Sequence, residues 1–162
     1  MNTSGSIVRQ DGEGERLWFA GGGIHIWKAS TKETGGAFLL FEDLLTRGKA
    51  TPLHTHPNAD EMLYVLEGEI LVHIAGAEHR VGPRGLAVAL RGIPHAFMVT
   101  SEAARVLCFE TPGNAEAFYR GASEPTSSES DVSKPPDFAR VGESAARNGG
   151  IEIIGPPPFH LA

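Results

Sequence analysis

The chain has 162 residues, a length that fits one domain and leaves little room for a second. Its hydrophobic content of 41% and charged content of 21% are ordinary for a soluble globular protein. The formal net charge of −6 argues against nucleic acid and against an anionic membrane surface as partners, because both require a basic patch.

Residues 1–16 lack the apolar run of a secretory signal, and no stretch approaches the roughly 20 apolar residues of a membrane span. The one cysteine, Cys108, excludes an internal disulfide and suits a reducing compartment. It lies in the apolar run 106–109, where we expect a buried and unreactive thiol. These features predict a cytoplasmic protein.

Short apolar runs alternate with glycine- and proline-containing turns along the first 111 residues, which is typical of an all-β fold. Strands this short, with turns about every 8–12 residues, favour a sandwich or a barrel. The expected strands are residues 17–19, 23–28, 37–44, 51–56, 61–67, 69–75, 78–81, 86–90, 95–100 and 104–111.

The composition changes after the predicted barrel domain, residues 1–121. Residues 122–136 are rich in Ser, Pro and Glu and predict a flexible linker. Residues 137–162 form a tail in which Asp137 caps a helix that runs to about Asn148, and Gly149 ends it. A helix this short is marginal alone in water, so we expect it to dock on the barrel or on a partner subunit.

Three histidines and a glutamate form a candidate metal site. His54 and His56 are two residues apart in a predicted strand, so their side chains lie on one face. Glu61 begins the next strand, and a later strand supplies His95. Three neutral imidazoles and one carboxylate suit one divalent transition metal per chain, with Fe, Mn, Co, Ni and Cu all open. A histidine cluster satisfied without a metal is the alternative interpretation.

Residues 48–68 resemble the first motif of the cupin superfamily, in which Gly48, His54, His56, Glu61 and Gly68 stand at the family's spacing. The resemblance implies a single jelly-roll barrel, also called a double-stranded β-helix. It further implies a metal inside one mouth of the barrel, and a homodimer.

Residues 90–99 resemble the second cupin motif more loosely. Gly92 and His95 stand in their places, but Leu90 replaces the usual proline and Val99 the usual asparagine. The glycine that opens this motif is also displaced, to Gly85. These departures affect turn geometry and leave the candidate ligands intact.

A narrower resemblance, to bacterial single-domain quercetin-dioxygenase-like cupins, rests on residues 34–38, 52–57, 60–68, 92–97, 111–113 and 145–157. It implies an enzyme, a metal-dependent dioxygenase that cleaves a flavonol or a similar enolisable aromatic with O2. Glu61 would then also be the catalytic base that accepts the substrate's hydroxyl proton. By strand parity, the apolar residues expected to bind the substrate are Leu63, Val65, Phe97, Val99, Phe38 and Leu40, although such residues also fill small barrels.

Two other functions remain open. One is a non-redox, metal-dependent cupin enzyme, such as an isomerase, decarboxylase or lyase; the other is a module that binds a small ligand without turnover. The C-terminal region is too short for a helix-turn-helix, which disfavours a DNA-binding regulator. The expected partners are therefore a small aromatic molecule, O2 and a second copy of the chain.

Other titratable residues do not enter the predicted site. His25, His73, His79 and His160 lack ligand spacing, and we expect His25 at an edge or dimer contact. The parity of its strand does not decide whether Glu110 reaches the interior.

Overall fold

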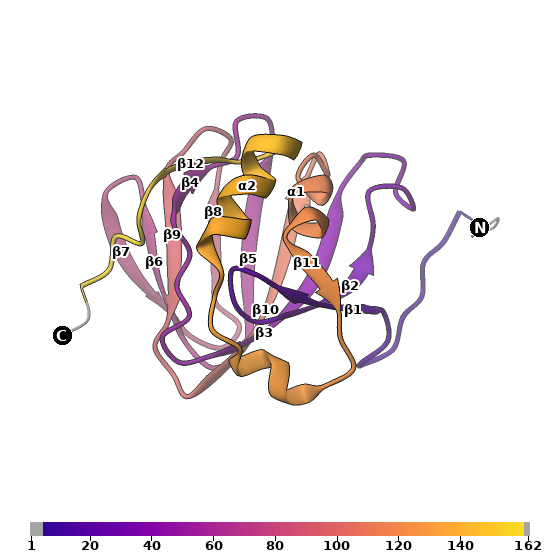
Figure 1. Cartoon of the computed structure of the whole chain (residues 1–162), viewed down its shortest axis with the longest axis horizontal. Coiled ribbons are helices and arrows are strands. Elements are labelled where there is room, and N and C mark those ends of the chain that lie inside the picture. The colour runs from indigo at the N-terminus through magenta and orange to yellow at the C-terminus, as the bar shows by residue number, and fades with distance from the viewer. Residues whose placement is uncertain (1–4, 161–162) are drawn as a thin grey trace.

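The structure, a computed structural model, describes residues 5–160 (Figure 1). The first four residues of the predicted segment 1–121 and the last two of 137–162 lie outside this range. Within it the elements are β1 (Glu15–Phe19), β2 (Ile24–Ala29), β3 (Leu39–Thr46), β4 (Leu53–Thr55), β5 (Asp60–Glu67), β6 (Ile70–Ile74), β7 (Ala77–Val81), β8 (Leu86–Ala89), β9 (His95–Val99), β10 (Ala103–Thr111), α1 (Glu116–Gly121), β11 (Ser123–Pro125), a 3-10 helix (Glu129–Ser133), α2 (Phe138–Asn148) and β12 (Glu152–Gly155).

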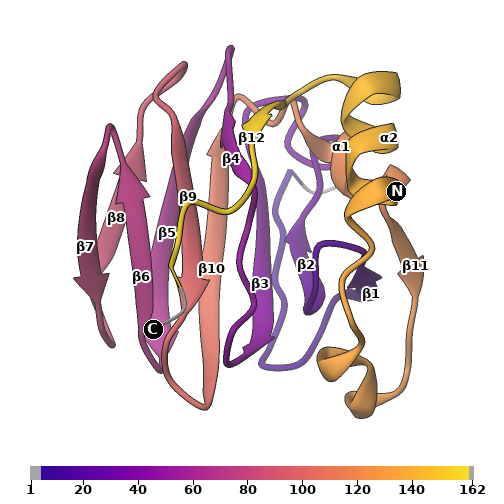
Figure 2. The same cartoon turned by 60° about the vertical axis from the view of Figure 1, so that its left-hand side comes forward.

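The described strands form two antiparallel sheets. The larger has the order β11-β1-β2-β3-β10-β5-β8, and the smaller has the order β12-β4-β9-β6-β7. The two sheets face each other and enclose the core, as Figures 1 and 2 show from two sides. The predicted all-β jelly-roll barrel with a short helical tail is therefore confirmed.

Alternating burial shows which side chains point into the barrel. Along β10, Ala104, Val106 and Cys108 are buried, whereas the residues between them are half-buried. This period of two is the geometry of a strand with one face on a core. Glu110 continues the inward series, so a carboxylate at this position enters the interior.

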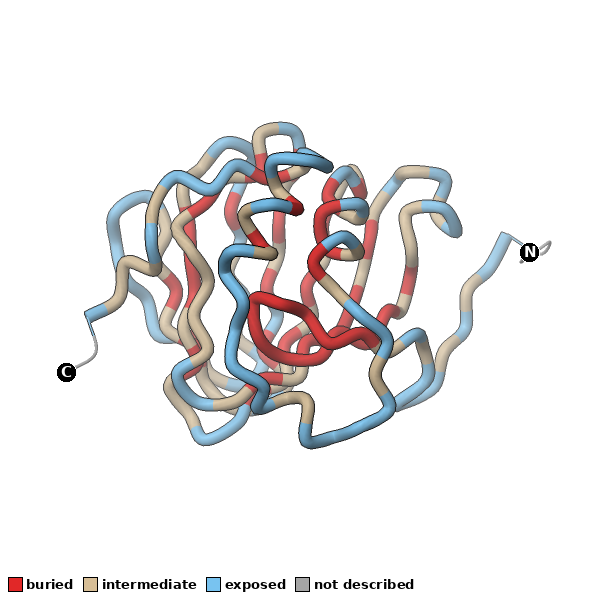
Figure 3. The backbone as a smooth tube through the Cα atoms, viewed as in Figure 1, coloured by how far each residue is buried: buried red, intermediate tan, exposed pale blue. Residues whose placement is uncertain are grey.

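The β1–β2 hairpin is unusually well covered, because all of residues 17–27 are buried (Figure 3). Helix α1 packs against it, because the rings of Phe118 and Tyr119 lie 6.0 and 5.9 Å from that of Phe19. The hairpin therefore contributes the interior residues of one end of the barrel rather than an exposed edge.

The C-terminal tail docks on its own barrel. Helix α2 begins after Asp137, whose carboxylate accepts a hydrogen bond from the Arg140 amide, and it ends at Gly149 with φ 64°, as predicted. Val141 and Ile151 are buried in the same hydrophobic cluster as the barrel residues. Strand β12 then pairs with β4, so the tail covers the strand that carries His54.

Residues 122–136, predicted as a flexible linker, contain short regular elements. Strand β11 pairs with β1, with Glu124 opposite Trp18, and the 3-10 helix follows. The Glu129 carboxylate also lies 2.8 Å from the Arg16 guanidinium. These partners are far away in the sequence, so local composition gives no sign of them.

No helix within residues 5–160 combines the length and the apolar character that a bilayer span requires.

Candidate metal centre

The four candidate ligands come from three neighbouring strands. His54 lies in β4 and His56 follows it, Glu61 is the second residue of β5, and His95 is the first residue of β9. His54 and His95 are opposite each other in the β4–β9 pair, which brings their rings to a centroid distance of 4.3 Å. The register of the β4–β9 pair therefore fixes His54 and His95, whereas Glu61 comes from β5 of the other sheet.

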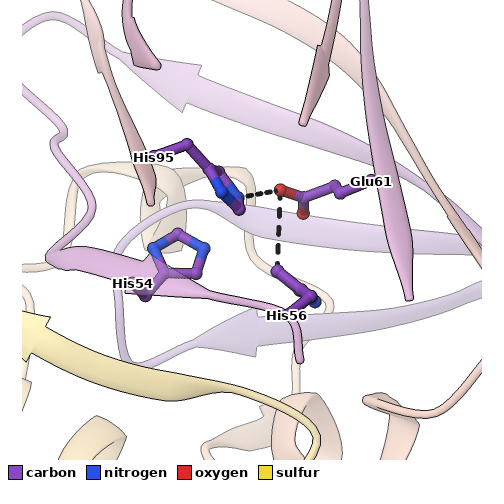
Figure 4. Close-up of side chains that lie close together, drawn as sticks. All are labelled: His54, His56, Glu61 and His95. Carbon is purple, nitrogen blue, oxygen red and sulfur yellow. Dashed lines mark hydrogen bonds and ion pairs between the residues drawn. The ribbon is translucent and has the colours of Figure 1, made fainter. Parts of the chain in front are cut away.

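The structure brings all four side chains together (Figure 4). One ligand atom from each of His54, His56, Glu61 and His95 lies within 4.8 Å of the others, and all four residues are buried. Glu61 Oε2 is 2.7 Å from His95 Nε2 and 3.6 Å from His56 Nε2. This cluster could hold one metal ion, with three nitrogen donors and one oxygen donor.

Two backbone carbonyls orient the histidine rings. Nδ1 of His54 donates to the Pro52 carbonyl at 2.8 Å, and Nδ1 of His95 donates to the Ile93 carbonyl at 2.9 Å. A carbonyl only accepts, so Nδ1 carries the hydrogen in both rings and the Nε2 lone pair faces the cluster when the ring is neutral. This is the tautomer that a metal ligand needs.

The contacts inside the cluster fit a cation. His56 Nε2 is buried and has no hydrogen-bond partner among the described residues. Nδ1 of His95 carries the ring hydrogen of the neutral imidazole, so a hydrogen bond between its Nε2 and Glu61 needs one more proton. A cation between the two groups would take the place of that proton.

The pKa values show which groups of the cluster are charged. Burial, with His95 and His56 close by, lowers the pKa of His54 to about 3, so this imidazole is neutral near pH 7. Burial raises the pKa of Glu61, but the three imidazoles outweigh it and hold the pKa well below its usual value.

Glu110, which the sequence analysis left undecided, lies behind one of the candidate ligands. It is 0% exposed and directly opposite Glu61 in the β10–β5 pair. Its Oε2 lies 3.2 Å from His56 Nδ1, and its Oε1 accepts a hydrogen bond from the Ala115 amide. A carboxylate behind a histidine ligand fixes the ring and raises its basicity. The inward alternation along β10 was the sequence signal that could have identified it.

The second oxygen of Glu61 is also held. Cys108 Sγ and Tyr119 Oη each lie 3.3 Å from Glu61 Oε1, and both groups are positioned to donate to it. Burial and the neighbouring carboxylate of Glu61 raise the pKa of both the thiol and the phenol well above their usual values. Both groups therefore keep their protons and occupy Oε1, and Oε2 is the oxygen of Glu61 that faces the histidines.

A cavity of about 50 Å³ adjoins the cluster. His54 and Glu61 line it on one side, and of the expected substrate-binding residues Leu63 and Phe97 also line it. Val65 and Val99 are buried in the surrounding core and do not line the cavity. Val141 and Ile151 from the tail also line it.

Phe38 and Leu40 lie outside the cavity, contrary to the expected parity. Leu39 and Phe41 are the buried residues of this segment, whereas Phe38 stacks on Phe109 at a ring distance of 5.2 Å on the outer face. A shift of one residue moves every side chain of a strand to the other face. The strand of residues 37–44 was thus assigned the wrong inward face.

A second polar group lines the same cavity and was not predicted. It consists of His25, Asp43 and Lys49. His25 is 1% exposed and lies between the rings of Phe19 and Phe41, so its expected place at an edge or dimer contact is wrong. The sequence signal for Asp43 was its position in the inward series Phe41, Asp43, Leu45, which begins one residue later than assumed.

The chain was compared with known proteins. Residues 41–110 match the cupin domain family. The chain is 27% identical over 118 residues to quercetin 2,3-dioxygenase of Bacillus subtilis (strain 168), an alignment that covers 73% of this chain but only 35% of that relative. Among solved structures, KdgF from Halomonas sp. superposes with a TM-score of 0.52 at 21% identity, over 69% of this chain and 90% of that one. Ectoine synthase from P. lautus gives 0.51 at 19% identity, over 77% and 83%. At these identities the structural matches show a shared fold.

Proposed function

This chain is a member of the cupin superfamily, and from that premise we propose that it is a metal-dependent dioxygenase acting on a flavonol or a similar enolisable aromatic compound. The observation that supports the proposal most strongly is the buried cluster of His54, His56, Glu61 and His95 beside an apolar cavity. The Bacillus relative supports the choice of O2 chemistry, although it shares only about a third of its length with this chain.

His54, His56, Glu61 and His95 would hold the metal, with Fe, Mn, Co, Ni and Cu as candidates. The bound ion would supply Lewis acidity at the substrate oxygen and, where redox-active, a path for electrons to O2. Glu61 is proposed to accept the substrate's hydroxyl proton, because it is ionised at neutral pH and lines both the cluster and the cavity. Leu63 and Phe97 would exclude water from the reacting atoms.

Quercetin and O2 provide the test. Metal-loaded protein mixed with quercetin without oxygen and then exposed to air should bleach the flavonol absorbance and release carbon monoxide. His54→Ala should lose bound metal and activity together, whereas His79→Ala, which replaces an exposed histidine, should behave as the wild type. A rate no faster than that of free metal would contradict the proposal.

A non-redox metal-dependent reaction is the second candidate, and the size of the cavity favours it. Pockets for drug-sized ligands measure ~300–1,000 Å³, whereas this cavity is about 50 Å³. A flavonol would fit only after the residues that line the cavity moved apart. Turnover of a small substrate that persists without oxygen would favour an isomerase, decarboxylase or lyase.

We also propose that the protein acts as a homodimer. Tyr64 is opposite Leu86, and Met62 is opposite Val88, on the outer face of β5 and β8. Tyr64, Leu86 and Val88 are all exposed, and β8 is the edge of its sheet. Exposed apolar side chains that adjoin one another commonly mark a protein interface, so a second copy of the chain is the expected cover.

A further inference from the structure

The polar group of His25, Asp43 and Lys49, which lines the cavity, includes buried atoms without hydrogen-bond partners among the described residues. Asp43 is 5% exposed, and its Oδ1 has no hydrogen-bond partner among the described residues; its distance to His25 Nε2 is 3.7 Å. The Nδ1 atom of His25 is likewise buried and unpartnered within residues 5–160. Buried polar atoms without partners cost about 1–3 kcal/mol each, so folding alone does not explain their presence.

Lys49 is the cationic member of this group. In the described part of the chain its ammonium has no carboxylate within 4.0 Å and instead lies over the rings of Phe97 at 4.6 Å and Phe19 at 5.9 Å. Burial lowers its pKa, against the opposing effect of Asp43, Cys108 and Glu61. An ammonium that faces an apolar cavity without a counter-ion is poised to pair with an anion brought by a ligand.

The cavity connects this cation to the candidate metal centre. His54 and Glu61 of the candidate centre line it, and so do Lys49, Asp43 and His25, with Phe41 and Phe97 among the apolar walls. Its volume of about 50 Å³ corresponds to on the order of four water molecules, which is room for a molecule of a few carbon atoms. A ligand that pairs with Lys49 and also reaches the candidate metal centre must be small and carry two separate oxygen functions.

We propose that the substrate is a small enolisable carboxylic acid, whose carboxylate pairs with Lys49 while its keto or enol oxygen faces the cluster of His54, His56, Glu61 and His95. The Asp43 carboxyl, in its protonated form, and a ring N–H of His25 donate hydrogen bonds that position this carboxylate. The inference rests on the proposed function, since it takes the metal cluster as the reactive end, and it replaces the flavonol by a smaller anionic substrate of the same enolisable kind.

Binding of 2-oxobutanoate and its uncharged isostere 2-oxobutanamide tests the inference. Titration calorimetry of metal-loaded wild type, with oxygen excluded, should show the acid bound at least tenfold more tightly than the amide. Lys49→Met should abolish this preference, Lys49→Arg should retain part of it, and Lys32→Met, which replaces an exposed lysine, should leave it unchanged. The metal content of every variant should equal that of the wild type.

Thermal unfolding separates recognition from a structural role. Removing a half-buried ammonium that has no ion pair among the described residues should leave the metal-free Lys49→Met protein as stable as the wild type or more stable. A marked fall in Tm for both Lys49→Met and Lys49→Arg would overturn the inference, as would equal binding of acid and amide, or no binding of either, in the wild type. Quercetin cleavage that persists unchanged in Lys49→Met would refute the acid substrate while supporting the dioxygenase.

Discussion

The candidate metal centre depends on residues behind the ligands as well as on the ligands. Glu110 illustrates this, because its carboxylate lies 3.2 Å from Nδ1 of His56, where it favours the tautomer that leaves Nε2 free to bind metal. In Glu110→Gln the amide NH2 group can face Nδ1 and favour the opposite tautomer, with the hydrogen on Nε2. We expect metal affinity to fall about 10–100-fold, measured by competition with a chromogenic chelator.

The matched control for this variant is Glu102→Gln, which replaces an exposed glutamate and should bind metal as the wild type does. Unchanged affinity in Glu110→Gln, with a native circular dichroism spectrum, would show that Glu110 does not orient His56.

Asp43 predicts a pH dependence of stability. Burial and the nearby Glu61 raise its pKa from 3.8 to about 7, although Lys49 opposes the shift. Between these two values the unfolded chain has released the proton and the folded protein has kept it, so the free energy of unfolding falls as pH rises from about 4 to about 7. Asp43→Asn lacks this contribution, and the Tm of the metal-free variant should decline less across the window than that of the wild type.

Asp11→Asn serves as the control, because Asp11 is exposed, and its Tm should follow that of the wild type. Parallel Tm curves for wild type and Asp43→Asn would mean that the Asp43 carboxyl is already ionised in the folded protein at low pH.

The sequence predicted the ligands better than it predicted the cavity. His54, His56, Glu61 and His95 could be recognised because their spacing follows strand parity and a family motif. Asp43, Lys49 and Glu110 could not be assigned with the same security, since a one-residue error in the start of a strand reverses its inward face. Partners that meet only because distant segments pair, such as Lys49 and Phe97, have no local signature at all.

At the scale of elements, the tail is part of the barrel's core. Val141 of α2 is buried and lines the cavity. Val141→Ala removes apolar atoms from a packed site, so we expect the free energy of unfolding in urea to fall by about 1–3 kcal/mol. The enlarged cavity should also bind bulkier ligands than the wild type accepts.

Val8→Ala, at a position that is 78% exposed, is the control and should change stability by less than about 0.5 kcal/mol. A loss equally small in Val141→Ala would show that α2 does not pack on the barrel in solution.

The order of elements was readable from the sequence, but the pairings of the tail were not. Each of the ten strands expected before residue 112 occurs within about two residues of its expected ends, because alternation and turn residues are local signals. Strands β11 and β12 are three and four residues long and pair with segments distant in the chain. Their formation depends on edges that only the assembled sheets provide.

For the whole molecule, the exposed apolar face of β5 and β8 predicts a dimer. Charged side chains introduced on this face should dissociate that dimer into monomers. Leu86→Lys combined with Leu90→Lys places two ammonium groups on this face, where both leucines are more than half exposed. Size-exclusion chromatography with light scattering should show a dimer for the wild type and a monomer for the double variant. Val8→Lys, on a different exposed segment, should remain dimeric, and a monomeric wild type would contradict the proposal.

Strand β12 links a wall of the cavity to the strand that carries His54. It is hydrogen-bonded along β4, and the next residues on its N-terminal side include the cavity wall Ile151. A movement of the tail that lets a molecule pass Ile151 would therefore also separate β12 from β4, the strand that carries His54. Ligand entry and metal dissociation would thus depend on the same movement of β12. A variant in which this movement is more frequent should also release a bound metal ion more quickly.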